Sequence, residues 1–554
     1  MVVPLIISSD KTQVTSFRNK AAYLVYLTIG NIPKSIWRKP SQGAQILLAY
    51  LPTTKLEHIP SKAARRRAMN NLSHSCMGRI FKPLRSIGVD GILMSTGAGV
   101  AHRTHPIFAC FSGDYPEQVL ATCTKTGECR ECDVPHDDLG ADAIDIHFRD
   151  IGKILAAHAL ADTNPIQFVH ACVDAGVKPT YHPFWTLLPY LNIFRSITPD
   201  VLHRLLQGIL KHIVAWVKSA FGPAELDARC RRLPPNHNVR LFLNGISNLS
   251  RLTGKEHDEI SRILLGILID LPLPNGRNSD RLIHAVRAVL DFLYISQYPV
   301  HTTESLAALD DALSAFHANK DIFIELAIRQ SFNIPKLHSL RHYSGSIKLF
   351  GTTDNYNTQA MEHLHIDYAK EAYRATNRKE EYPQMTIWLE RKEKVARHAS
   401  YIAWALAADH HVESLQQTTT LVLSRSIKMP KHPSISSVSL ELLVNDYRAT
   451  YLREALAWYI VATNHPDWMA WQVEEAALDT FLHFGKLPVF HKVKFISTTD
   501  QETCIIDSIH ANGPRKKKQG RYTVPGRFDT ALACVGECGE IGVQGNLLNH
   551  HLWC

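Results

Sequence analysis

Runs of apolar residues predict a set of β-strands in the first 115 residues. The runs have the length and β-branched content of strands, and Pro or Gly bounds most of them. They cover residues 2–7, 23–32, 44–51, 91–94 and 106–111. Residues 61–87 have the spacing of an amphipathic helix instead. Asp10 lies just beyond the first run, and Asp114 follows the last one, where Pro116 favours the start of a helix.

The order of these elements is strand, strand, strand, helix, strand, with one Asp after the first strand and one after the last. This is the order of the ribonuclease-H-like fold, in which two central strands bring carboxylates to one edge of the sheet. The sequence therefore predicts an α/β fold with a mixed sheet, and it predicts that Asp10 and Asp114 lie at the same edge.

Helical patterns dominate the rest of the chain. They cover residues 201–221, 256–271, 280–296, 305–318, 321–330, 355–410 and 440–463, and a strand is expected after residue 485. We expect a ribonuclease-H-like core in residues 1–150, a large helical insertion in 151–345 and a returning helix of the core in 346–410. A helical region would follow in 411–480, and a β-rich, partly irregular tail in 481–554.

Composition narrows the class of protein only slightly. The 554 residues carry a net charge of +9, which permits a polyanionic partner without requiring one. No apolar run has the roughly 18–20 residues that a membrane-spanning helix needs, and the N-terminus lacks the basic segment of a signal peptide. Eleven Cys spread over this length do not form a disulfide framework, which indicates a reducing compartment.

One CxxC motif, Cys129–Cys132, supplies half of a tetrahedral zinc site. Two completions are open. Cys123 and His136 lie nearby, whereas the distant pair His338 and His342 has the i, i+4 spacing that presents both imidazoles on one helix face.

A third carboxylate is available in residues 357–367, where Glu362 lies on a predicted helix. Two divalent ions activate an attacking oxygen and stabilise a leaving oxygen in phosphoryl transfer, and such ions need several carboxylates. Asp354 and Asp367 would serve the same argument. Asp200 is another candidate, although its position before a helix is typical of an N-cap.

Seven motifs in order resemble the Plavaka-type transposases of the Kyakuja–Dileera–Zisupton group, over residues 1 to about 540. They are SSDKTQ around Asp10, HPIFACFSGDYPEQVLATC around Asp114, CxxCxVP from Cys129, PDxLH around Asp200, DDALxxFHxNKD from Asp310, FNIPKLHSLRHY from Phe332 and NTxxxEHLHIDYAK around Glu362. The layout is also similar to that of CACTA-type transposases and the V(D)J recombinase.

The resemblance implies a D-D-E transposase that cleaves and joins phosphodiesters at transposon ends with Mg²⁺ or Mn²⁺. Asp10, Asp114 and Glu362 match the three catalytic acids, and Asp200 is an alternative second acid. Cys129, Cys132, His338 and His342 match a structural zinc site that pins the insertion onto the core. The family often has Glu where this chain has Gln359, which leaves Glu362 as the acid of that helix turn.

The expected partner is DNA, with self-association and a nuclear location following from the same resemblance. Candidate DNA-binding residues are Arg65, Arg66, Arg67, Lys82, Arg85, Arg391, Lys392 and Lys394. A basic run at residues 515–518 could serve nuclear import or phosphate binding.

Other classes of protein stay open. Only nine residues precede Asp10, so one alternative is a truncated or inactive transposase relic that binds DNA or protein. A zinc-stabilised helical interaction protein is a further alternative.

Overall fold

The computed structural model describes most of the chain. The described residues are 1–15, 20–37, 43–95, 100–142, 145–234, 236, 239–250, 252–407, 424–498, 504–516, 523–524, 527–528, 531–534 and 550–553. The chain forms two compact units, one of residues 1–233 and 242–411, and one of residues 234–241 and 412–554.

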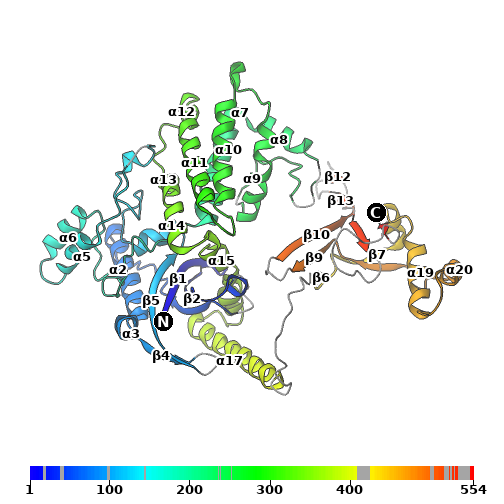
Figure 1. Ribbon diagram of the computed structural model, residues 1–554, viewed down its shortest axis with the longest axis horizontal. Helices are drawn as coiled ribbons and strands as arrows, with labels where there is room; N and C mark the ends of the chain where they lie inside the picture. Colours follow the sequence, from blue (N-terminus) through cyan, green and yellow to red (C-terminus); the bar gives the residue numbers. More distant parts are fainter. Residues whose placement is uncertain are drawn as a thin grey trace. The chain divides into compact units, whose positions relative to one another are not determined.

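A five-stranded mixed sheet lies at the centre of the first unit (Figure 1). Its strands are β1 (Val2–Gln13), β2 (Ala21–Ile29), β3 (Ile46–Leu51), β4 (Ile92–Ser95) and β5 (Ala101–Ser112), in the order β3-β2-β1-β5-β4. β1 pairs in parallel with β5, whereas the pairs β1–β2, β2–β3 and β4–β5 are antiparallel. Ile197 adds a parallel bridge to Phe111 near the end of β5. The sequence prediction of a mixed α/β fold is confirmed.

The first strand is longer than the apolar run suggested. Asp10 lies within β1 and pairs with Leu24, and the ladder to β2 continues to Gln13. The run stops at Ile7 because Ser8 and Ser9 follow it, yet both serines are buried. The end of β1 is therefore set by its pairing with β2, and not by the point at which the apolar residues stop.

Alternate residues of β2 face two different cores, as the two-residue period of a strand requires. Tyr23 and Val25 pack in a large core with Met77 and Phe81. Leu24 and Tyr26 pack on the opposite face, in a cluster with Leu364 and Ala369. The sheet is therefore covered on both faces, and the second face is covered by a segment more than 300 residues away in sequence.

Helices α2 (Lys62–Phe81) and α3 (Leu84–Asp90) replace the single helix expected over residues 61–87. The break falls at Pro83, which has no N–H for a helical hydrogen bond and crowds the preceding turn. Helices α4 (Tyr115–Ala121), α5 (Ile151–Ala159) and α6 (Pro165–Asp174) follow. Ile154 and Phe168 belong to the core beneath the sheet, so residues 151–197 pack with the sheet and not with the later helices.

The remaining helices of this unit form a second core. In chain order they include η3 (Val201–Leu210), α7 (Lys211–Phe221), α8 (Pro223–Arg232), α9 (Gly254–Leu268), α10 (Asp280–Ile295), α11 (Thr303–Asn319), α12 (Ile322–Glu325), α13 (Pro335–His338), η5 (Ser339–His342) and α14 (Tyr343–Phe350). The chain returns to the sheet through α15 (Gln359–His365), η7 (Ile366–Glu371), α16 (Ala372–Arg374) and α17 (Glu381–Ala407). No described helix is both long and apolar enough to cross a bilayer.

The second unit mixes strands and helices. One sheet has the order β13-β10-β9-β6 and joins β6 (Ser424–Lys428) to β9 (Lys492–Thr498), β10 (Cys504–Asn512) and β13 (Arg527–Phe528). β7 (Ile435–Ser439) pairs with β8 (Lys486–Val489), and between them lie α18 (Leu440–Asn445), α19 (Leu452–Asn464) and α20 (Ala470–Leu478). Strands from both sides of residue 480 therefore share ladders. Arg448, with φ 57°, lies between α18 and α19 in place of one continuous helix.

His74 gives the core beneath the sheet a dependence on pH. It is 1% exposed, its Nε2 lies 2.9 Å from the carbonyl oxygen of Leu120, and its Nδ1 accepts the backbone N–H of Phe184 at 3.4 Å. Burial lowers its pKa to about 4, so the folded chain holds a neutral imidazole. Between the folded and unfolded pKa values the unfolded chain binds more protons, so stability falls as the pH drops below about 6.5.

We expect His74→Gln to remove part of this pH dependence. Between about pH 7 and pH 4.5 the wild-type chain should lose roughly 2–3 kcal/mol more free energy of unfolding than the variant does. Urea unfolding of both proteins at the two pH values measures the difference. Parallel losses in the two proteins would contradict a neutral, buried His74.

Candidate active site and metal centre

Three carboxylates come from three separate parts of the fold. Asp10 lies in β1, Asp114 is the N-cap of α4 directly after β5, and Glu362 lies in α15. The parallel pairing of β1 with β5 brings the first two to one end of the sheet. Glu362 reaches the same place because the cluster of Leu364 and Ala369 packs α15 and η7 onto β2.

Asp200 holds this site together through its hydrogen bonds. Its carboxylate accepts the backbone N–H groups of Leu202 (3.3 Å) and His203 (2.6 Å) as the N-cap of η3. It also accepts the backbone N–H (3.2 Å) and the hydroxyl (2.7 Å) of Thr358. The N-cap role predicted for Asp200 is confirmed. In addition, Asp200 fixes the start of the helix that carries Glu362.

His203 links Asp200 to Glu362. Its Nδ1 lies 2.8 Å from Asp200 Oδ2, and its Nε2 lies 3.3 Å from Glu362 Oε1. Burial opposes protonation, but the two carboxylates outweigh it and raise the pKa of His203 to about 10. The imidazole is therefore a cation at neutral pH, and contact with it holds the pKa of Glu362 below its usual value.

Asp10 and Asp114 lie in a partly desolvated, negatively charged environment. Burial, together with the charges of Asp114 and Glu362, raises the pKa of Asp10 to about 6 against the opposing effect of His203. Burial likewise raises the pKa of Asp114. One oxygen of each accepts a backbone N–H, from Lys11 (2.7 Å) and from Glu117 (2.9 Å). An environment that disfavours two neighbouring anions is what a bound cation would relieve.

Three further ionisable groups surround these acids. Lys336 donates to the carbonyl of His203 at 2.9 Å, and the Nε2 of His365 lies 3.7 Å from Asp10 Oδ2. Glu117 is half-buried and accepts the hydroxyls of Ser9 and Tyr23, each at 2.6 Å. Burial raises the pKa of Glu117 to about 8. These contacts tie β1, β2 and α4 together beside Asp10 and Asp114.

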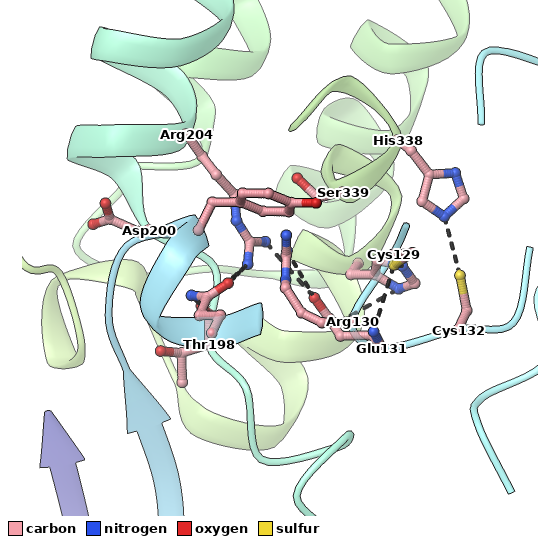
Figure 2. Close-up of polar contacts among 12 residues, drawn as sticks. Cys129, Arg130, Glu131, Cys132, Thr198, Asp200, Arg204, His338 and Ser339 are labelled. Carbon is pink, nitrogen blue, oxygen red and sulfur yellow. Dashed lines mark hydrogen bonds and ion pairs between the residues drawn. The ribbon is translucent and has the colours of Figure 1, made fainter. Parts of the chain in front are cut away.

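A second cluster joins Cys129 and Cys132 to His338 and His342. The Sγ of Cys129 lies 3.3 Å from Nε2 of His342, and the Sγ of Cys132 lies 3.1 Å from Nε2 of His338 (Figure 2). All four side chains are buried, and their potential ligand atoms lie within 4.8 Å of one another. The structure thus brings together the CxxC motif and the distant histidine pair.

This donor set fits zinc. Zn–S and Zn–N bonds of about 2.3 and 2.1 Å give S···N edges of about 3.5 Å in a tetrahedron, close to the two observed separations. The local completion is not formed, because Cys123 Sγ contacts Nε2 of His74 at 3.3 Å and the exposed His136 contacts the carbonyl of Gly127 at 2.9 Å. Four protein ligands would leave no open position, which is typical of a structural site.

The acids are spaced differently. Among the described residues, Cys129, Cys132, His338 and His342 form the one group of three or more potential ligands whose atoms all lie within 4.8 Å. Asp10, Asp114 and Glu362 are spread more widely. A pair of ions about 3.5–4 Å apart is held by carboxylates that need not all touch one another.

The candidate DNA-binding residues are mostly exposed. Arg66, Arg67, Lys82 and Arg85 project into solvent from α2 and its junction with α3, whereas Arg65 donates to the carbonyl of Ile59. On α17, Arg391 is exposed, Lys392 lies near Asp367 and Glu371 (3.5 and 3.7 Å), and Lys394 pairs with Glu390 at 2.6 Å. Of the basic run at 515–518, residues 517 and 518 lie outside the described residues.

Residues 1–217 match the family model of the Plavaka transposase. The resemblance found in the sequence motifs is confirmed for this segment. The matched segment contains Asp10, Asp114, Cys129, Cys132 and Asp200, and it ends before His338, His342 and Glu362. The match indicates a transposase-related function, for which DNA is the partner. A search among curated proteins found no match to the chain.

Several residues of the site escaped the sequence argument. His203 was seen as part of the PDxLH motif, but its salt bridge to Glu362 depends on a contact across more than 150 residues. Glu117 and Lys336 lie within recognised motifs without a distinguishing pattern.

Purified chain should carry one zinc per molecule, bound at the Cys₂His₂ cluster. Cys132→Ser should lose most of the zinc and lower the unfolding temperature, since binding at a preformed cluster adds directly to folding free energy. Cys76→Ser, which alters a partly exposed thiol elsewhere, is the matched control. Metal analysis together with thermal unfolding checks this, and full zinc content in Cys132→Ser would contradict the assignment.

Asp200 and Asp114 should respond in opposite ways to loss of charge. Asp200→Asn leaves the half-buried His203 cation without its closest anion and should lower the free energy of unfolding by roughly 3 kcal/mol. Asp114→Asn keeps a good N-cap and removes a repulsion with Asp10, so stability should be unchanged or higher. Urea unfolding at neutral pH in the absence of divalent ions measures both. Equal destabilisation would contradict the different roles of the two acids.

Proposed function

We propose that the chain is the catalytic core of a DDE-type DNA transposase, which cleaves and joins phosphodiesters at transposon ends. The observation that carries this proposal is the convergence of Asp10, Asp114 and Glu362 at one end of the sheet, where the charges of the other two acids raise the pKa of Asp10. The Plavaka match, which includes Asp10 and Asp114, supports it.

The first unit is a ribonuclease-H-like core interrupted by a helical insertion. Three antiparallel strands, β3-β2-β1, continue into β5, which runs parallel to β1, and Ile197 adds a further parallel bridge beside β5. This connectivity supports the fold, because β1 carries Asp10 and Asp114 follows the end of β5, the strand that pairs with β1.

Asp10, Asp114 and Glu362 would hold two Mg²⁺ or Mn²⁺ ions. Such a pair of ions would supply activation of the attacking oxygen, of water or of a DNA 3′-hydroxyl, and stabilisation of the leaving oxygen. Asp114 is the second acid and Asp200 is its support, because both Asp200 oxygens already accept protein hydrogen bonds. His203 orients Glu362 through their 3.3 Å contact.

DNA lies against the basic residues of α2, α3 and α17 in this proposal. Arg66, Arg67, Lys82, Arg85 and Arg391 are exposed and suited to phosphate contact. Arg65, Lys392 and Lys394 have protein partners in the free chain and would have to exchange them for phosphate. Zinc bound by Cys129, Cys132, His338 and His342 would hold the insertion to the core. Action on chromosomal DNA requires a nuclear location, and transposon ends are paired by self-association.

The test is Mn²⁺- or Mg²⁺-dependent nicking and joining of transposon-end DNA. The rate should fall by at least about a hundredfold in each of three variants, Asp10→Asn, Asp114→Asn and Glu362→Gln. Each substitution removes a carboxylate charge that would bind the divalent ions, and these ions stabilise the phosphate during transfer. Asp174→Asn is the matched control, because Asp174 is an exposed acid at the end of α6, apart from the acids and from the candidate DNA-binding residues.

Undiminished nicking in Asp114→Asn or Glu362→Gln would overturn the catalytic assignment. A wild-type chain that binds DNA but shows no Mn²⁺ binding dependent on the three acids would instead favour an inactive relic. A chain that zinc removal unfolds and that nucleic acid leaves unaffected would favour an interaction protein.

A further inference from the structure

Two charged residues stand between the cysteines of the metal cluster and are nearly inaccessible to solvent. Arg130 is 0% exposed and Glu131 is 3% exposed. Taking a charged pair out of water costs several kcal/mol per ion in a protein interior unless other contacts compensate. Neither residue is needed to ligate zinc, so the contacts that they make elsewhere are informative.

On one side Glu131 faces the metal cluster. Its Oε2 lies 3.7 Å from Nδ1 of His342, whose Nε2 faces Cys129. Metal-bound histidines commonly direct their second nitrogen to a carboxylate, which fixes the orientation of the ring. Glu131 is therefore placed to respond to the position of His342.

On the other side Glu131 faces Arg204, a residue of η3 that is 1% exposed (Figure 2). Glu131 Oε1 lies 3.7 Å from Nη1 of Arg204 and 3.4 Å from Nη2 of Arg130. Two buried guanidinium groups thus share one carboxylate. In addition, Nη1 of Arg204, and Nε and Nη1 of Arg130, are buried and make no hydrogen bond to any described residue. A shift of Glu131 would leave both cations poorly compensated.

Arg204 also contacts Gln118, which forms hydrogen bonds to the turns before Asp114 and Asp200. Its Nη2 donates to Gln118 Oε1 at 2.6 Å. The amide nitrogen of Gln118, which is 0% exposed, donates to the carbonyls of Gly113 (2.7 Å) and Thr198 (2.9 Å). Gly113 directly precedes Asp114, and Thr198 is two residues before Asp200. The buried side-chain amide of Gln118 therefore joins the two turns by hydrogen bonds.

A separate contact ties the same loop to Asp114. The guanidinium of Arg130 lies 5.4 Å from the ring centroid of Tyr115, the residue after Asp114. The hydroxyl of Tyr115 accepts the backbone N–H of Gly127 at 2.9 Å and donates to the carbonyl of Glu128 at 3.3 Å. The loop that carries the cysteines thus packs against the first turn of α4.

We propose that Glu131, Arg204 and Gln118 are positioning residues that couple the Cys₂His₂ cluster to the acids. Zinc fixes His342 and the loop 129–132, and the chain Glu131–Arg204–Gln118 then holds the turns of Asp114 and Asp200 in the geometry that binds divalent ions. This inference rests on the proposed function, since it requires the acids to bind such ions. Because coupling between two binding sites is reciprocal, Mn²⁺ at the acids tightens zinc by the same factor.

The experiment measures Mn²⁺ affinity by electron paramagnetic resonance, using the full chain loaded with zinc and the full chain stripped of it. In the wild type, removal of zinc should weaken Mn²⁺ binding about tenfold, the lower end of what outer contacts contribute at metal sites. In Glu131→Gln, which keeps the size of the side chain, the effect of zinc should fall to near zero. Asp133→Asn changes an exposed carboxylate next to Cys132 and should retain the full effect.

Should the zinc-free chain unfold, the zinc-loaded variants answer the question alone. Glu131→Gln should then bind Mn²⁺ about tenfold more weakly than Asp133→Asn, at a temperature well below unfolding and with equal zinc content. If Glu131 only stabilised the fold, Glu131→Gln would lower the unfolding temperature without changing the Mn²⁺ affinity.

Two outcomes would overturn the coupling and leave the proposed function intact: Mn²⁺ affinity that does not depend on zinc in a folded wild-type chain, or full coupling retained in Glu131→Gln. In the form of the test that keeps zinc bound, equal Mn²⁺ affinities in Glu131→Gln and Asp133→Asn would overturn it as well. Failure of the proposed function gives a different result. In that case Mn²⁺ binding by the zinc-loaded chain would be absent, or it would be the same in the wild type and in Asp114→Asn.

Discussion

The arrangement of the acid site depends on the buried carboxylate of Asp200. Its hydrogen bonds to Thr358 join segments 158 residues apart, and its contact with His203 brings a cation against Glu362. Without this group the helix that carries Glu362 would lose its fixed start, and the half-buried His203 cation would lose its nearest partner. Both helical segments beside the site, η3 and η7, are π-helices, a form that is rare and often found at functional sites.

A second attachment lies at the Cys₂His₂ cluster, where Cys129 and Cys132 meet His338 and His342. The helices of residues 201–350 are therefore held to the sheet at two places, one by hydrogen bonds and one by four potential metal ligands. Buried charges lie between these places. Such groups stabilise poorly on their own, but they fix one arrangement, because any other leaves charges unpaired. The insertion therefore helps to fix the positions of acids that themselves lie at the end of the sheet and on α15.

Local sequence patterns predicted what local physics determines. Apolar runs identified the strands of the sheet, and the position of Asp200 before an apolar helix identified its capping role. Local patterns did not show what contacts between distant segments decide. Asp10 is inside β1 because β2 pairs with it, and residues 151–197 belong to the core beneath the sheet because Ile154 and Phe168 pack there. His203, Glu117 and Gln118 look ordinary in sequence, since their roles arise only when residues far apart in the chain meet.

The most direct measurement of this account is a crystal structure of the chain grown with Mn²⁺, with anomalous scattering recorded at the zinc and manganese edges. The account predicts a zinc peak among Cys129, Cys132, His338 and His342. It also predicts manganese peaks among Asp10, Asp114 and Glu362, with Asp200 still bound to Thr358 and His203. Manganese coordinated by Asp200 in place of Asp114, or acids that bind no manganese at all, would contradict it.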